Sequence, residues 1–137
     1  MAIRFEELYV GQEYKKVFSV TEQKGQAFAE VSEDFNLLHL DEEYAQNTMF
    51  KGRIAHGMLV ASFISGVLGN DFPGYGTIYL GQELQFVRPV HYGDEITVVV
   101  KILEIDKETR RVKLSTICKN QLDKNVIEGY AQIMKKE

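Results

Sequence analysis

The sequence predicts a single α+β domain, residues 1–137, in which an antiparallel sheet wraps around a long, buried central helix. Three observations support this fold class. The length of 137 residues suits one domain. The apolar segment "GMLVASFISGVLG", residues 57–69, is too long for a typical strand. From residue 76 onward, segments with alternating polar and apolar residues are separated by turn sequences, which is typical of a β-sheet.

The first third of the chain predicts one strand and one helix. Residues 12–20 alternate as a strand, with Tyr14, Phe18 and Val20 on the same face as Lys16. Thr21 is a suitable N-cap for a helix that ends near Ser32 and places Ala27, Phe28 and Val31 on one side. Residues 34–47 are expected to be mainly loop, with one helical turn in 41–47.

The central helix is predicted over residues 57–69. Ser62 and Ser65 are its only hydroxyl residues, and apolar side chains occupy nearly the whole of its circumference. A helix that is apolar on all sides is usually buried on all sides. The remaining elements are therefore expected to surround it.

Four strands in hairpin succession are predicted to supply that covering. The first, residues 76–89, has Ile78, Leu80, Leu84 and Phe86 on one face and Thr77, Tyr79, Glu83 and Gln85 on the other. A turn at 91–94, a strand at 95–105, a hairpin loop at 106–110, a strand at 111–120, a turn at 122–125 and a last strand at 126–134 follow. This order is the hotdog arrangement. Such domains expose a sheet edge, and a homodimer is expected.

Composition excludes several classes of function. The net charge of −4 and the scattered basic residues argue against a nucleic-acid partner. The longest apolar stretch is shorter than the roughly 20 residues that a transmembrane helix needs, and the N-terminus does not resemble a signal peptide. The single cysteine, Cys118, cannot form an internal disulfide or a thiolate metal site, and we expect it to be a buried strand residue. A cytoplasmic protein is expected.

The stretch "SEDFNLLHLDEEYA", residues 32–45, places Asp34, Asn36 and His39 within six positions. Two interpretations are open. Aspartate and asparagine often hydrogen-bond nearby backbone in turns, and for an isolated pair this structural role is the more frequent one. Alternatively, Asp34 and His39 form an acid–base pair at the floor of a pocket.

A second stretch, "RIAHGML", lies at the start of the central helix. The backbone N–H of Gly57 would be unpaired there and would point along the positive end of the helix dipole, which suits an oxyanion. Tight packing against the sheet would also explain this glycine. We expect His56 to be structural, whereas Arg53 could bind a phosphate or pair with an acid such as Asp41.

Together, the acid–base pair and the oxyanion donor are what proton chemistry beside a thioester carbonyl requires. Addition of water across a C2–C3 double bond builds negative charge on that carbonyl oxygen. The N–H of Gly57 could stabilise this charge while a carboxylate and an imidazole hold the attacking water.

These residues resemble the MaoC-like (R)-specific enoyl-CoA hydratases. The family motif Asp-x-Asn-Pro-x-His is similar to "DFNLLH", and a histidine–glycine pair before an apolar helix is similar to "AHGMLVASFISGVLG". The likeness is strongest from residue 28 to residue 96. The sequence departs from the pattern at Leu37, where the family has proline, and at Glu33, where many members have glycine.

The resemblance implies a role for each matching position. Asp34 and His39 would activate one water, and the N–H of Gly57 would stabilise the oxyanion. Asn36 and Ser65 would be supporting residues, with Ser65 on the inward face of the long helix. The reaction would reversibly hydrate a trans-2-enoyl-CoA to an (R)-3-hydroxyacyl-CoA, in a homodimer. No metal or redox cofactor would be needed, since CoA enters as part of the substrate. Fatty-acid oxidation, polyester (polyhydroxyalkanoate) precursor supply and biosynthetic dehydration all remain open as pathways.

Three other functions compete with the hydratase. A hotdog acyl-CoA thioesterase would use a carboxylate and a helix N-terminus but would not need the complete "DFNLLH" motif. A non-catalytic acyl-CoA-binding module is the second, and a dehydratase subunit that acts only with a partner chain is the third. The basic residues that could contact CoA phosphates receive no assignment: Arg88, His91 and Lys101.

Overall fold

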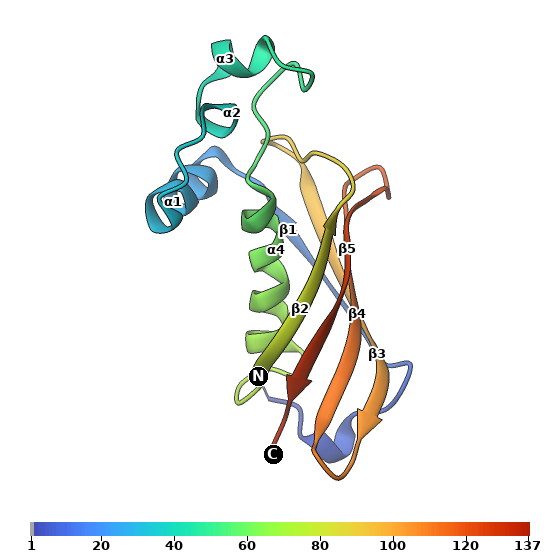
Figure 1. The fold of residues 1–137 in the computed structure, drawn as a ribbon. Helices are drawn as coiled ribbons and strands as arrows, with labels where there is room; N and C mark the ends of the chain where they lie inside the picture. The colour runs from blue at the N-terminus through green and yellow to red at the C-terminus, as the bar shows by residue number, and fades with distance from the viewer. Residues whose placement is uncertain (1) are drawn as a thin grey trace.

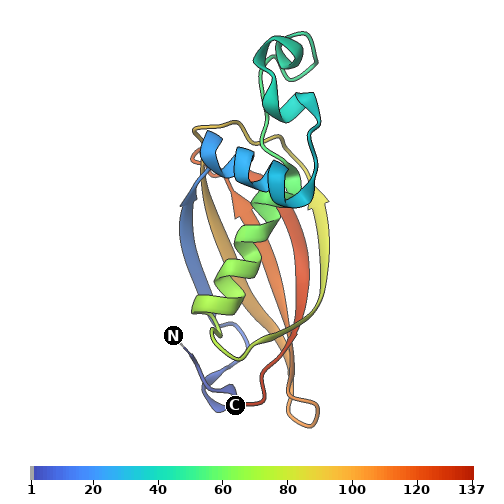
Figure 2. The ribbon, with the colours of Figure 1, turned by 90° about the vertical axis from the view of Figure 1, so that its left-hand side faces the viewer.

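A computed structural model describes residues 2–137 and confirms the α+β fold class, with one antiparallel sheet packed against a central helix. Figure 2 shows α4 lying across the concave face of the sheet, and Figure 1 shows α2 and α3 beyond one end of that sheet, with α1 beside the same end of α4. The elements are η1 (Phe5–Glu7), β1 (Glu13–Ser19), α1 (Glu22–Ser32), α2 (Leu37–Leu40), α3 (Glu42–Gln46), α4 (Gly57–Gly66), the π-helical turn η2 (Val67–Asp71), β2 (Ile78–Phe86), β3 (Glu95–Asp106), β4 (Arg111–Lys119) and β5 (Asn125–Met134).

The strand order is β1-β3-β4-β5-β2, with every neighbouring pair antiparallel. The predicted hairpins between β3 and β4 and between β4 and β5 are confirmed. The prediction that β2 and β3 also form a hairpin is wrong, because β2 pairs with β5 at the opposite edge from β1. The connection between β2 and β3, which contains the predicted turn at 91–94, instead runs across the end of the sheet beside α1 (Figure 2).

The core lies between α4 and the sheet. Ile64, Val67 and Leu68 are at most 1% exposed, and the inward side chains of β3 that face them are fully buried. The prediction that α4 is covered on all sides is wrong for one stripe, because Met58, Ser62 and Ser65 are exposed. One sheet can cover only one side of a helix, and β2 stops short of wrapping round to the other.

Helix α1 has the predicted bounds and the predicted cap, since the Thr21 side chain accepts a hydrogen bond from the Lys24 N–H. Its predicted apolar face is partly wrong. Gly25 and Ala29 are the buried residues, whereas Val31 is 85% exposed. Phe28 packs against the core, as predicted, while the small Gly25 permits close approach of Tyr92 from the segment 91–94.

Residues 34–47 contain more helix than predicted. The expected turn in 41–47 is confirmed as α3, with Asp41 as its N-cap. However, the preceding residues form α2 rather than loop, with the Asn36 side chain accepting from the Leu38 N–H. His39 therefore lies in a short helix, and its ring has a fixed direction.

Strand β2 contains a bulge that the alternation did not predict. Its register with β5 shifts between Tyr79 and Gly81, so Leu80 is the extra residue. Tyr79 lies opposite the buried Ile133, and Ile78 therefore faces the other side of the sheet. The predicted common face of Ile78, Leu80, Leu84 and Phe86 is consequently interrupted at its start.

Two expectations from composition can be compared with the structure. Cys118 is a fully buried strand residue, as predicted, and burial raises the pKa of its thiol to about 12, so it is unreactive. Within residues 2–137, no helix combines the length and the apolar character needed to cross a bilayer.

Candidate active site

His39 presents one free ring nitrogen toward the predicted site. Its Nδ1 lies 2.8 Å from the backbone oxygen of Ile54. A carbonyl oxygen only accepts hydrogen bonds, so Nδ1 carries the proton and Nε2 is left as a bare acceptor. The second backbone contact of this segment, from the Ile54 N–H to the Leu38 carbonyl, holds α2 in place. His39 is therefore arranged as a proton acceptor.

Asp34 lies just after α1 and forms the local backbone hydrogen bonds that a turn aspartate often makes. Its carboxylate accepts a hydrogen bond from the Asn36 N–H at 3.2 Å, and its own N–H donates to the Ser32 hydroxyl at 3.1 Å. The preceding Glu33 has φ 61°, in the left-handed region that glycine adopts most readily. The backbone at this departure from the family pattern thus keeps a conformation that suits the family's glycine.

The two predicted catalytic side chains are brought together, with His56 as a third member. A carboxylate oxygen of Asp34 and one ring nitrogen each of His39 and His56 all lie within 4.8 Å of one another. Burial lowers the pKa of His39; the hydrogen bond to Ile54 and the charge of Asp34 raise it, and the neighbouring His56 lowers it further. The net pKa lies below the ordinary value, so the His39 imidazole is neutral near pH 7 and able to accept a proton.

Gly57 is the first residue of α4, so its N–H has no acceptor within the helix. A Cβ added to Gly57 would lie 2.8 Å from the ring of Phe86, so only glycine leaves this approach open without displacing that ring. The N-terminus of α4 points toward the segment that carries Asp34 and His39 (Figure 1). Its partial positive charge suits a developing oxyanion.

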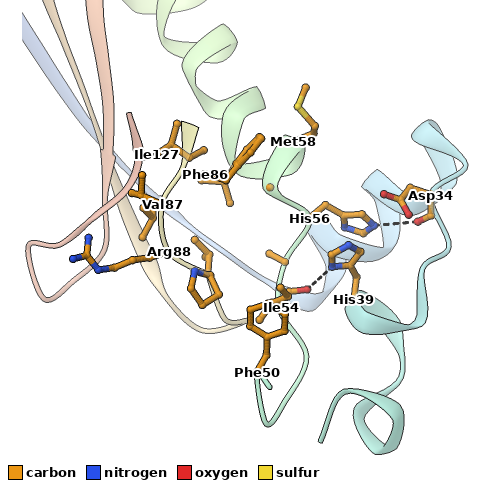
Figure 3. Close-up of a pocket in the computed structure, with 16 residues that line it drawn as sticks. Asp34, His39, Phe50, Ile54, His56, Met58, Phe86, Val87, Arg88 and Ile127 are labelled. Atoms are coloured by element: carbon orange, nitrogen blue, oxygen red, sulfur yellow. Dashed lines mark hydrogen bonds between the residues drawn. The ribbon is translucent and has the colours of Figure 1, made fainter. Parts of the chain in front are cut away.

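A cavity of about 470 Å³ joins these groups. Figure 3 shows Asp34, His39 and His56 at one end and Arg88 at the other, with apolar side chains between them. The volume is within the range of small-molecule sites. Arg88 donates to the Asn125 backbone oxygen at 2.7 Å. The other lining residues are mainly apolar: Phe50, Ile54, Ala55, Met58, Val60, Phe86, Val87, Pro89, Val90, Val126 and Ile127.

The two predicted supporting residues lie apart from each other. Asn36 caps α2 and so supports the helix that carries His39. Ser65 is exposed rather than inward-facing, and it lines a separate groove of about 430 Å³ between α4 and β2. In a single chain, Ser65 is not part of the cavity that contains Asp34 and His39. His91 and Lys101 do not line this cavity either.

The sequence did not indicate that Tyr92 supports the site. Its hydroxyl donates to the backbone oxygen of His39 at 3.0 Å, and its ring fills the space where a Cβ of residue 25 would be. Arg53 stacks over that ring at 5.2 Å. Arg53 also forms ion pairs with Glu22 and Glu42. The expectation that Arg53 could pair with an acid is therefore confirmed, although its partners are not Asp41.

Asp34, His39 and His56 each offer one atom of a type that binds metal ions, so together they could also hold a divalent cation. One ring nitrogen of each histidine is already bonded to a backbone carbonyl, and among residues 2–137 the other nitrogen of each ring has no backbone partner. The same cluster can equally exchange protons with a water and a substrate.

The sequence profile of the MaoC like domain matches residues 7–125, which is most of the chain. The chain belongs to the MaoC-like domain family. This MaoC-like protein is 44% identical to an (R)-specific enoyl-CoA hydratase from Rhodospirillum rubrum over 130 residues, covering 95% of this chain and 90% of the relative. It is 42% identical to a 3-hydroxybutyryl-CoA dehydratase from Methylorubrum extorquens, covering 97% and 85% of the two chains. The solved structure of an unliganded R-hydratase from Pseudomonas aeruginosa superimposes with a TM-score of 0.95 at 46% identity, covering 99% of this chain and 87% of that one.

Proposed function

We propose that this MaoC-like protein catalyses the (R)-specific hydration of trans-2-enoyl-CoA to (R)-3-hydroxyacyl-CoA, and the reverse dehydration. One observation carries the proposal: a carboxylate, an imidazole with a bare Nε2 and a free helix N–H all line one mainly apolar cavity. The (R) configuration rests on the likeness to the R. rubrum and P. aeruginosa hydratases.

In the proposed reaction, Asp34 and His39 hold one water between them. The neutral His39 Nε2 accepts a proton from that water while its oxygen bonds to C3 of the enoyl group, and the C2–C3 π electrons move toward the thioester carbonyl. The Gly57 N–H donates to the carbonyl oxygen as it gains negative charge. The dyad then returns the proton to C2, so one molecule of water is added and every group regains its starting state.

We further propose that this reaction needs no metal or redox cofactor. Hydration changes no oxidation state overall, and the proton carriers and the oxyanion donor are all side chains or backbone of this chain. CoA enters with the substrate, and Arg88 at the far end of the cavity is placed to meet an anionic group. The single free, buried cysteine suits a reducing compartment, and we propose the cytoplasm.

We also propose that the active form is a homodimer joined at β2. This strand is a sheet edge, and Ile78, Leu80 and Phe86 along it are 42%, 41% and 53% exposed. The groove beside it carries the uncovered stripe of α4, with Met58 and Ser65 in its lining. A second copy paired to β2 by a two-fold axis would continue the sheet and cover this groove.

The deciding experiment follows the enoyl-thioester absorbance when purified protein is added to crotonyl-CoA. We expect the absorbance to fall and the product to be oxidised by an (R)-specific, but not an (S)-specific, 3-hydroxyacyl-CoA dehydrogenase. Release of free CoA would indicate a thioesterase instead. Binding of crotonyl-CoA and longer enoyl-CoA esters without turnover would indicate a non-catalytic module or an incomplete subunit.

Substitution of the dyad tests the assignment of residues. Asp34→Asn and His39→Gln should each lower kcat by about 10²-fold or more, the usual contribution of a general acid–base group. Asp123→Asn and His91→Gln are matched controls on exposed turns outside the cavity, and they should keep wild-type activity. The dyad assignment would be wrong if either Asp34→Asn or His39→Gln kept near-full activity.

A further inference from the structure

His56 contacts both members of the dyad although the proposed reaction does not use it. Its side chain is 2% exposed, immediately before α4. Its Nε2 lies 3.0 Å from the backbone oxygen of Asp34, and its ring centroid lies 4.0 Å from that of His39. Figure 3 shows the His56 ring between these two residues, with its bond to Asp34 dashed.

The hydrogen bond to Asp34 determines the tautomer of His56. A backbone oxygen only accepts, so Nε2 carries the proton and Nδ1 is bare. That Nδ1 is buried and has no hydrogen-bond partner within residues 2–137. A buried polar atom without a partner is unfavourable and calls for an explanation. If His56 only filled space beside Phe28, whose ring is 5.0 Å away, a phenylalanine would do so without this penalty.

We propose that His56 is a positioning residue, whose Nε2–H fixes the peptide of Asp34 and whose ring fixes the imidazole of His39. The inference rests on the proposed function of those two residues. Because His56 is bonded covalently to Gly57, the same side chain also ties the dyad to the oxyanion donor. The carboxylate, the imidazole and the helix N–H are thereby held as one unit, although they come from three segments of the chain.

His56 has a secondary electrostatic influence on His39. The titratable groups that face the His39 ring are Asp34, from the segment after α1, and His56, from the segment before α4. The Tyr92 hydroxyl bonds the His39 backbone oxygen, and Arg53 lies over the Tyr92 ring. When His56 gains a second proton at acidic pH, its charge lowers the pKa of His39, so removal of His56 should raise that pKa.

The test compares His56→Phe with His56→Gln in the full-length protein. The phenylalanine keeps a ring of similar size but no donor, and we expect kcat to fall by about 10²-fold, the effect of a small misplacement of catalytic groups, with KM nearly unchanged. The glutamine Nε2 can still donate to the Asp34 carbonyl, so His56→Gln should recover at least about a tenth of wild-type kcat. The acidic limb of the pH profile should move to higher pH in both variants. His91→Phe, at an exposed position, is the matched control and should leave kcat unchanged.

Three results would overturn the inference while the hydratase activity stands. They are a wild-type kcat and pH profile in His56→Phe, equal losses in the phenylalanine and glutamine variants, or a loss explained by a lowered melting temperature. A readout independent of activity is the ring ¹⁵N spectrum, which should show His56 as the neutral tautomer protonated at Nε2. A different tautomer would contradict the proposal even if the wild-type protein did not hydrate crotonyl-CoA, so failure of the function and failure of this inference are distinguishable.

Discussion

At the scale of single residues, the chemistry depends on His39 being neutral with its free nitrogen toward Asp34. The Ile54 carbonyl selects the tautomer, and burial keeps the ring uncharged by lowering its pKa. The first effect comes from the direction of a hydrogen bond and the second from desolvation of the ring. Both are needed for His39 to act as a base near neutral pH.

The pH dependence of the reaction follows from this lowered pKa. Protonation of His39 removes its acceptor, so kcat/KM for crotonyl-CoA should fall on the acid side with a midpoint below 6.5, the ordinary value for histidine. Above that midpoint the base is fully available, and activity should be level through neutral pH. Rates measured from about pH 5 to pH 8 would cover the transition. A midpoint above 6.5 would mean that Asp34 and the Ile54 bond outweigh burial.

Physical reasoning from the sequence grouped Asp34, His39 and Gly57 as parts of one site but left a capping role open for Asp34, and the resemblance favoured the catalytic role. The structure contains both features, the local hydrogen bond from the Asn36 N–H and the proximity to His39. His56 was expected to be structural, and Tyr92 gave no signal. Their partners are 22 and 53 residues away in sequence, so neither contact follows from local spacing.

At the scale of elements, the long strands were predictable because their side chains alternate between a buried and a half-exposed face. The placement of β2 was not, because strand pairing depends on contacts across the whole sheet rather than on the turn that follows the strand. Helix α2 was missed because it has only four residues, and its stability comes from the cap by Asn36 and from the bond between Leu38 and Ile54.

The departure at Leu37 leaves α2 in the geometry that a proline would impose. Leu37 is the first residue of α2, a position where proline is favourable, and Asn36 before it has ψ 126°, which a residue preceding proline prefers. Leu37→Pro should therefore raise the free energy of unfolding by about 0.4–1 kcal/mol and leave kcat unchanged. Thermal or denaturant unfolding with a crotonyl-CoA assay measures both quantities.

Leu38→Pro is the matched control for that change. The Leu38 N–H donates to the Asn36 side chain, and proline would remove this cap. We expect lower stability and a displaced His39, hence lower activity. If Leu37→Pro lowered activity as much as Leu38→Pro, then α2 would not have the proline-compatible backbone described here.

At the scale of the whole molecule, two cavities share Met58 as a lining residue. The first contains the dyad, and the second contains Ser65 and is open to solvent beside β2. If another copy of the chain covered this second cavity, Met58 and Ser65 would be buried. Burial is what we expect for residues of a central helix that is otherwise part of the core. The proposed dimer would thus complete the burial of α4 that the single sheet leaves unfinished.

Leu80→Glu tests this assembly because Leu80 lies in the bulge of the edge strand and is 41% exposed. A charge there would be buried without a partner at the proposed interface, and its two-fold copy would lie nearby, so association should weaken by at least about tenfold. Sedimentation or light scattering at micromolar concentration should give twice the chain mass for the wild type and a shift toward the single chain for Leu80→Glu. Leu122→Glu, in the turn between β4 and β5 and 69% exposed, is the matched control and should remain dimeric. A monomeric wild type would contradict the dimer itself, whereas equally stable dimers for both variants would place the interface on a surface other than β2.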